Sequence, residues 1–269
     1  MTPSIDDRPE DHPGDRYEGR YKTLRVSREG PVLRVRLNLP ETGNTLTAEV
    51  LDELLTVLGG LNDRPGIRVL VLSGAGDDFC LGADREEFTT SLGADPTGAE
   101  LRVIMDKARR VCEALDTTTA VTVARLHGRV IGAGLALAVF CDLRIGADTC
   151  RFRLPEVALG VAPVWGGVLP RLIGEAGAAR IRELILTCAP FDAERAHELS
   201  VLHRVVPAAE LDASVASWTG PLLRRPAGAL PLAKLVLGAY SRGSRFMDGS
   251  LLDAQLLSSA CAAGVSRRE

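Results

Sequence analysis

The sequence predicts an α/β fold, because apolar strand patterns alternate with helical patterns and glycine-bearing turns join them. Residues 67–74 (IRVLVLSG) and 120–128 (AVTVARLHG) are mainly apolar runs of the kind buried on both faces of a parallel sheet. A helical pattern over about 98–116 separates the two runs, which gives the strand–helix–strand order of parallel α/β proteins. Ligand sites in such proteins lie beyond the carboxyl ends of the strands, so the loops after these runs are the first candidates.

The chain before these strands divides into a tail, a hairpin and a helix. Residues 1–19 combine Pro, Gly and charged residues with almost no large apolar side chains, so we expect a disordered tail. Residues 23–39 contain two short β-type runs on either side of Glu29-Gly30-Pro31, which predicts a hairpin. Residues 46–62 repeat apolar side chains at helical spacing, with Thr47 as the expected N-cap and a glycine pair at the end.

Helical patterns dominate from about residue 176 onward. We therefore expect an α/β core over residues 20–200 and a C-terminal helical segment over residues 201–269. The sequence contains no repeat of the length typical of solenoid proteins.

Composition narrows the class of protein. The chain has 269 residues, 46% of them hydrophobic, and a net charge of −3, so it can bury a large core and lacks a sequence-wide basic field for nucleic acid. Its six cysteines lack CxxC spacing, which indicates reduced thiols rather than a disulfide framework or a metal site. The sequence shows neither an apolar signal segment nor a run of about 18 apolar residues. We therefore expect a cytoplasmic protein without metal, nucleic-acid or membrane sites.

Two glycine-bearing loops follow the two apolar strands. Residues 73–84 (SGAGDDFCLGAD) lead toward a helix expected near Arg85, and residues 128–134 (GRVIGAG) open a helix at Gly132. Two such turns can place two backbone N–H groups side by side next to a helix N-terminus, which suits a developing oxyanion. Alternatively, the glycines only allow strand and helix to pack closely. A dinucleotide-binding turn is disfavoured, because the full GxGxxG spacing and the later ribose-binding acid are missing.

Four motifs in this order and spacing carry a family resemblance. They are FCLGADREEF (79–88), HGRVIGAGLALAVFCDLRIG (127–146), FRLPEVALGVAP (152–163) and FDAERAHELSVLHRVVP (191–207). With them, the chain resembles the crotonase (enoyl-CoA hydratase/isomerase) superfamily from about residue 20 to residue 262. The resemblance implies a spiral of ββα units with a C-terminal helical trimerisation segment. It also implies a homotrimer or hexamer that acts on a coenzyme A thioester without any further cofactor.

The resemblance further implies which residues bind the thioester. In the family, one oxyanion donor is the residue after the glycine in the first loop, here Ala83, and the other falls in the GxG turn, here Ala133. Both donate through the backbone N–H, so an alanine at either position is no obstacle. Leu81, Gly82 and Gly132 flank these donors and are expected to line the substrate site.

This chain departs from the pattern of two catalytic acids found in the hydratases of the family. Hydratases of the family carry one glutamate three residues beyond the second donor and one in a Pro-Glu dipeptide; here these positions hold Ala136 and Glu156. Addition of water is usually described with two carboxylates, whereas double-bond isomerisation needs one. We therefore expect Glu156 to be the sole acid/base, although it could also be an ordinary exposed acid. Glu86 and Glu87 could replace the missing acid or could simply cap the helix N-terminus.

The remaining polar and aromatic positions each have a functional and a structural interpretation. Trp165 could close the acyl pocket or pack in the core, and Lys234 resembles a family lysine near the CoA phosphates but could instead be a surface helix lysine. Asp84 and Asp142 are expected to be structural, as the family places them. The histidines His127, His197 and His203 show no metal-type spacing.

The sequence leaves the reaction open within one scaffold. The first hypothesis is an acyl-CoA enzyme that isomerises a double bond or catalyses hydration and dehydration through an enolate. The alternatives are a C–C lyase or decarboxylase, and a non-catalytic subunit that binds an acyl-CoA or acyl-carrier thioester. Fold alone does not decide between them.

Overall fold

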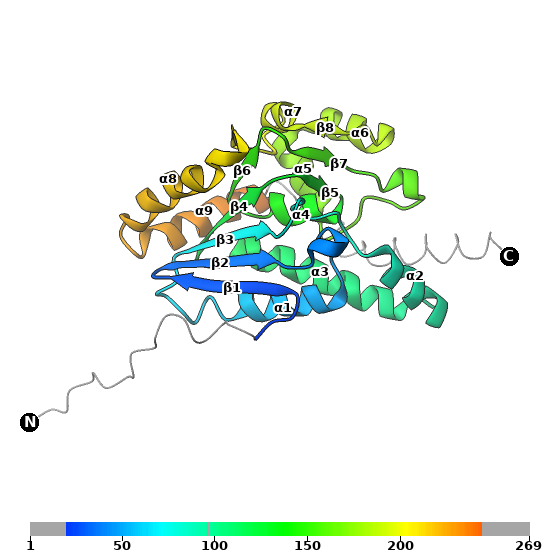
Figure 1. Cartoon of the computed structure of the whole chain (residues 1–269), viewed down its shortest axis with the longest axis horizontal. Coiled ribbons are helices and arrows are strands. Elements are labelled where there is room, and N and C mark those ends of the chain that lie inside the picture. Colours follow the sequence, from blue (N-terminus) through cyan, green and yellow to red (C-terminus); the bar gives the residue numbers. More distant parts are fainter. Residues whose placement is uncertain (1–19, 96, 244–269) are drawn as a thin grey trace, which may run out of the picture.

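The fold contains two sheets wrapped by helices (Figure 1). The structure, a computed structural model, describes residues 20–95 and 97–243, so the tail expected over residues 1–19 lies outside this part. The large sheet has the strand order β1-β2-β3-β4-β6-β9, and the small sheet has the order β5-β7-β8. In the large sheet, only the pair β1–β2 is antiparallel, and the other four neighbouring pairs of strands are parallel. This arrangement confirms the predicted α/β class.

The secondary-structure elements have the following bounds. The strands are β1 (Leu24–Glu29), β2 (Val32–Leu37), β3 (Val69–Gly74), β4 (Val121–Leu126), β5 (Arg129–Ile131), β6 (Leu143–Ala147), β7 (Arg151–Arg153), β8 (Phe191–Asp192) and β9 (Arg204–Val206). The α-helices are α1 (Ala48–Gly59), α2 (Arg85–Ala94), α3 (Ala99–Thr117), α4 (Ala133–Val139), α5 (Val168–Ala176), α6 (Ala178–Thr187), α7 (Ala193–Glu198), α8 (Leu211–Leu223) and α9 (Ala229–Gly243). Short 3-10 helices are η1 (Pro40–Thr42), η2 (Val157–Leu159) and η3 (Ala208–Glu210).

The predicted hairpin is present as β1 and β2. Gly30, in the turn, has φ 57°, a conformation that side chains with a Cβ rarely adopt. Along β1, Leu24 and Val26 are buried while Arg25 and Ser27 are exposed, so the two faces of the strand differ in polarity. The apolar face packs into the main core, and the polar face stays open.

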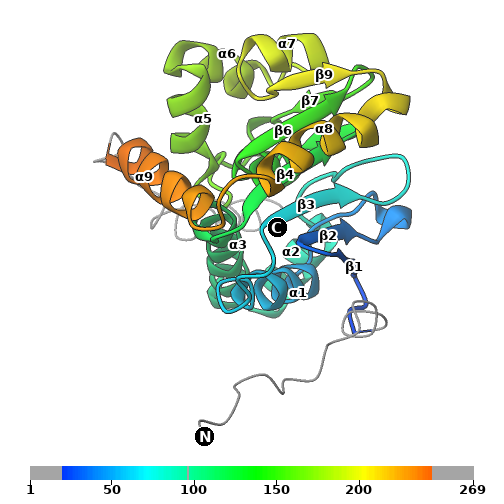
Figure 2. The same cartoon turned by 90° about the vertical axis from the view of Figure 1, so that its left-hand side faces the viewer.

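Helices cover the large sheet unequally on its two faces. Helix α1 begins at the predicted N-cap, where the Thr47 hydroxyl accepts a hydrogen bond from the Val50 amide at 3.2 Å, and it packs along α3 under the hairpin. On the other face, α8 contacts β3, β4 and β6 (Figure 2). Among the described helices, none packs extensively on the part of that face formed by β1 and β2.

The segment over residues 201–269 was expected to be helical, but it begins with a short strand. Residues 204–206, in the segment expected to be helical, form strand β9, which pairs with β6 and ends the large sheet. A three-residue strand is too short to show an alternating pattern, so helical residues around it hid it. Helices α8 and α9 follow as expected, and residues 244–269 lie outside the described part of the chain.

Candidate active site

The two glycine-bearing loops are held against each other by backbone and side-chain bonds. The Cys80 amide donates to the Arg129 carbonyl at 3.3 Å, and the Ile131 amide donates to the Cys80 carbonyl at 3.0 Å. The Asp78 carboxylate accepts three bonds of 2.7–3.0 Å from Arg129, one of them from its backbone amide. Burial alone would raise the pKa of Asp78, but the bonds and charge of Arg129 outweigh burial and lower it. These bonds, which we call the Asp78–Arg129 clamp, therefore keep Asp78 ionised and hold the two loops together.

Helix α4 approaches the first loop closely because its second residue is glycine. A Cβ at Gly134 would lie 2.5 Å from the Cys80 carbonyl oxygen, closer than carbon and oxygen can pack. A Cβ at Gly82 would lie 3.6 Å from the Ala133 nitrogen. The start of α4 therefore lies directly beside the chain that carries Gly82 and Ala83.

The amides of Ala83 and Ala133 are both available as donors. Leu46 donates to the Gly82 carbonyl at 2.8 Å and accepts from the Asp84 amide at 3.1 Å, so the amide of the residue between them points to the opposite edge. Ala133 is the first residue of α4, where an amide has no partner within its own helix. Within residues 20–95 and 97–243, neither amide donates a hydrogen bond. The two expected donors thus lie in adjoining segments and are unused.

Glu156 lies at the same helix start. Strand β7 pairs with β5, and the Gly132 amide donates to the Arg153 carbonyl at 3.0 Å, which brings the turn after β7 next to α4. A Cβ at Gly132 would lie 2.9 Å from Glu156 Oε1, so the carboxyl lies directly against this glycine. Glu156 Oε2 is buried and has no hydrogen-bond partner in the described part of the chain. Burial raises the pKa of Glu156, as is typical of acid/base groups in active sites.

No second carboxylate takes the place of the missing acid among the candidates. Ala136 is fully buried within α4. The Glu87 carboxylate accepts from the Ala48 amide at 2.9 and 3.1 Å and so caps helix α1, while Glu86 is exposed on α2. Of the two candidates for the second acid, Glu87 is therefore a helix cap and Glu86 is a surface residue.

Three further candidates have structural partners. Asp84 caps α2 by accepting from the Glu87 amide at 2.9 Å, as expected for a structural residue. Asp142 accepts from the amide and hydroxyl of Thr122. The Lys234 Nζ lies 2.7 Å from Asp142 Oδ2 and donates to two backbone carbonyls, and the side chain is only 9% exposed, so it is a buried helix lysine rather than a surface one. The pairing arises because α9 packs its lysine inward against α3 and β4.

The other named residues are packed against neighbouring elements. Trp165 is buried in the core, and the glycine that follows it presses against α3. Leu81 is half-buried and lies over Gly43. His127 Nε2 is 2.9 Å from the Gly76 carbonyl, and His203 Nδ1 accepts from the Arg144 amide. His197 is exposed. The described residues contain no cluster of three potential metal ligands and no helix suited to cross a membrane.

Sequence reasoning missed the Asp78–Arg129 clamp. The two residues are 51 positions apart, so no local spacing links them. The signal that could have found them is a pair of opposite charges in two glycine loops that were already expected to meet.

Comparisons with known proteins identify the family of this chain. The family model for enoyl-CoA hydratase/isomerase matches residues 27–267. A probable enoyl-CoA hydratase of Mycobacterium bovis is 32% identical over 90% of this chain and 91% of the relative, and the hydroxycinnamoyl-CoA hydratase-lyase of Pseudomonas fluorescens is 31% identical over 72% and 70%. A Thermobifida fusca protein assigned as an enoyl-CoA hydratase, solved with acetoacetyl-CoA, superimposes with a TM-score of 0.75 at 29% identity and covers 91% of this chain and 95% of its own.

The agreement extends over nearly the whole described chain. The matched residues include both glycine-bearing loops, helix α4 and the turn that carries Glu156. The chain therefore belongs to the enoyl-CoA hydratase/isomerase, or crotonase, family of enzymes.

Proposed function

We propose that this protein acts on an acyl-CoA thioester through an enolate, with Glu156 as its single acid/base. The thioester oxygen accepts hydrogen bonds from the amides of Ala83 and Ala133. The Glu156 carboxylate removes a proton from the α- or γ-carbon of the acyl chain, and the electron pair of the C–H bond moves onto the thioester oxygen. The same carboxyl returns the proton to another carbon, which shifts the double bond without water.

The observation that carries the proposal is the Glu156 carboxyl beside Gly132, whose buried Oε2 has no hydrogen-bond partner in the described part of the chain. A buried carboxyl oxygen without a hydrogen bond costs stability, and such groups are typical of functional sites. With Ala136 in place of a second acid, isomerisation is the favoured reaction, and hydration or dehydration would have to use Glu156 alone. The similarity to a hydratase-lyase makes cleavage of a C–C bond the second candidate.

The direct test is hydrogen exchange in deuterium oxide. Enzyme mixed with enoyl-CoA and saturated acyl-CoA substrates should incorporate deuterium at the α- or γ-carbon, as followed by NMR. An absence of exchange and of turnover over a broad panel, together with tight acetoacetyl-CoA binding, would instead identify a non-catalytic binding subunit.

Ionisation of the Glu156 carboxyl should increase activity and decrease the stability of the fold. The base works only when ionised, so kcat/KM should fall as the pH drops through the raised pKa, with a midpoint above pH 4.5. Because the folded pKa exceeds the unfolded one, the folded state binds the proton more tightly, and stability is lost as the pH rises through the folded pKa. A pH–rate profile and thermal melts across the same range check both signs.

We expect Lys234 to matter for stability rather than for CoA affinity. Replacing Lys234 with methionine leaves Asp142 without its cation, which for a largely buried pair costs about 3 kcal/mol. For a chain of this length the melting temperature should fall by about 6–12 °C. Titration of acetoacetyl-CoA at a temperature where the variant is folded should give an unchanged dissociation constant. A tenfold loss of affinity without a change in melting temperature would return Lys234 to the phosphate site.

We also propose that α9 contributes to a homotrimer or hexamer. Its described part exposes Leu232, Leu235, Leu237 and Tyr240, at 62–81%, and such an apolar face is typical of a subunit contact. Sedimentation velocity should give three or six times the chain mass of 28.7 kDa, and a monomer at micromolar concentration would contradict it.

A further inference from the structure

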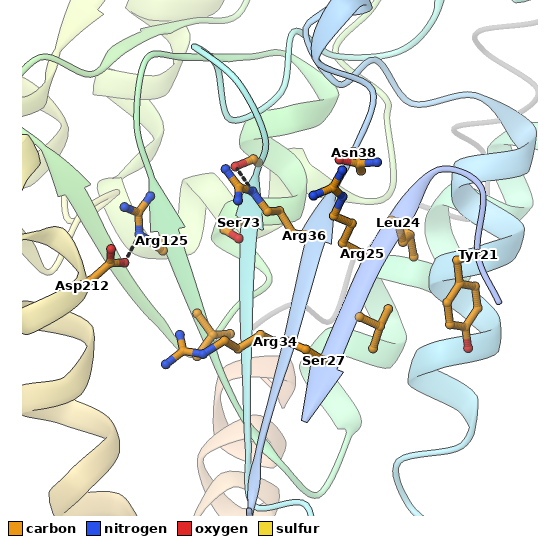
Figure 3. Close-up of a pocket in the computed structure, with 13 residues that line it drawn as sticks. Tyr21, Leu24, Arg25, Ser27, Arg34, Arg36, Asn38, Ser73, Arg125 and Asp212 are labelled. Carbon is orange, nitrogen blue, oxygen red and sulfur yellow. Dashed lines mark hydrogen bonds and ion pairs between the residues drawn. The ribbon is translucent and has the colours of Figure 1, made fainter. Parts of the chain in front are cut away.

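A cavity of about 710 Å³ lies on the face of the large sheet that α1 and α3 do not cover (Figure 3). Four arginines line it: Arg25 from β1, Arg34 and Arg36 from β2, and Arg125 from β4. The carboxylate in the lining is Asp212 at the start of α8. We call this cavity the arginine groove.

The positive charge of the arginine groove is only partly neutralised. Arg125 pairs with Asp212 at 2.6 Å, and Arg34 pairs with Glu29 at 3.0 Å. Arg36 donates to the Gly74 carbonyl, which carries no charge. Within the described chain, the Arg25 side chain has neither an ion pair nor a hydrogen bond. Among the residues that the structure describes, Arg25 and Arg36 therefore form no ion pair in the groove.

The strand register places those two cations directly opposite each other. Arg25 pairs with Arg36 across β1 and β2, and like charges in this position destabilise a sheet. The positive charge of the groove also acts on Asp212. The hydrogen bond and charge of Arg125 lower the pKa of Asp212 despite its burial, and the charges of Arg34 and Arg36 lower it further. An anion bound between the two guanidinium groups would relieve this repulsion.

We propose that the arginine groove binds a chain of linked phosphates, as carried by a nucleotide or an inorganic polyphosphate. Guanidinium groups bind phosphate oxygens through two parallel hydrogen bonds, and Ser27 and Ser73 add hydroxyl donors in the same lining. Neighbouring strands are about 4.8 Å apart, so Arg36 and Arg125, two strands apart, span about 10 Å. This spread suits several linked phosphates better than one. The volume is also that of a typical small-molecule site.

The groove is separate from the thioester site. Its lining runs from the middle of strands β1 to β4 to the carboxyl ends of β2, β3 and β4, and it includes no residue of the loops after β3 and β7, which carry Ala83 and Glu156, and none of helix α4. We therefore expect the groove and the thioester site to be occupied at the same time.

Calorimetric titration of the full chain with inorganic tripolyphosphate, ATP and orthophosphate tests the proposal. Tripolyphosphate should bind at least tenfold more tightly than orthophosphate. The double substitution Arg25→Gln and Arg36→Gln should weaken tripolyphosphate binding at least tenfold. The double substitution Arg25→Lys and Arg36→Lys should give an affinity between that of the parent and that of the double Gln variant. Arg182→Gln, at an exposed arginine of α6, is the control and should change nothing. Tighter binding of ATP than of tripolyphosphate points to a nucleotide, and equal or weaker binding points to polyphosphate.

Thermal melts give a second measurement that does not depend on tight binding. Without ligand, the double Gln variant should melt no lower than the parent, because the opposed charges are gone; tripolyphosphate should stabilise the parent only. Unchanged affinity in the double variant, or displacement of tripolyphosphate by acetoacetyl-CoA, would overturn the proposal of a separate site.

Discussion

Replacing Glu156 with glutamine is expected to lower kcat/KM for an enoyl-CoA substrate by about 10²- to 10⁴-fold, the usual contribution of a positioned acid/base. Glutamine keeps the shape of the side chain but cannot take up a proton at neutral pH. Deuterium exchange at the acyl carbons should be lost to the same extent. The effect should be at the large end of this range, because neither Glu86 nor Glu87 has a free, buried carboxylate to replace it.

The control for this variant is Glu86→Gln, which removes an exposed carboxylate from α2 and should leave the rate unchanged. Both variants should bind acetoacetyl-CoA as the parent does. Glu156→Gln should also melt no lower than the parent at pH 8, because it removes a buried charge without a partner. Unchanged exchange in Glu156→Gln would remove this residue from the mechanism.

The substitution Gly134→Ala should reduce kcat by about 10²- to 10³-fold, as does loss of one oxyanion donor in other enzymes. The added Cβ would lie 2.5 Å from the Cys80 carbonyl oxygen, so α4 and the first loop must move apart. That movement separates the amides of Ala83 and Ala133. Steady-state kinetics and circular dichroism would distinguish lost turnover from lost folding.

A matched glycine in another helix provides the comparison. In α5, Gly174 has nothing within 4 Å of an added Cβ, so Gly174→Ala should keep full activity and melt slightly higher. Full activity in Gly134→Ala would show that the close approach of α4 does not support catalysis.

Local patterns in the sequence predicted most of the backbone plan, because each of those signals acts over a few residues. The turn at Gly30, the N-cap at Thr47 and the apolar runs of β3 and β4 all have local causes. Strand β9 was missed because three residues carry too little pattern. The helix pattern over about 98–116 likewise predicted α3, which spans Ala99–Thr117.

Contacts between distant segments could not be derived from these patterns. Lys234 and Asp142 meet only because α9 returns to the end of β4, and Gly132 meets Glu156 only because β5 pairs with β7. The roles of Ala83, Ala133 and Glu156 came from the family resemblance and remain predictions. What the sequence did show unaided was that two glycine loops follow neighbouring strands.

Helix α4 is enclosed at every one of its seven residues. A helix surrounded in this way cannot rotate or slide without displacing the strands and loops around it. In the proposed mechanism, its leading N–H group, that of Ala133, keeps a fixed orientation, so the reaction would spend little free energy on rearranging dipoles as charge builds up on the thioester oxygen. Rigidity at this point would then itself contribute to the rate.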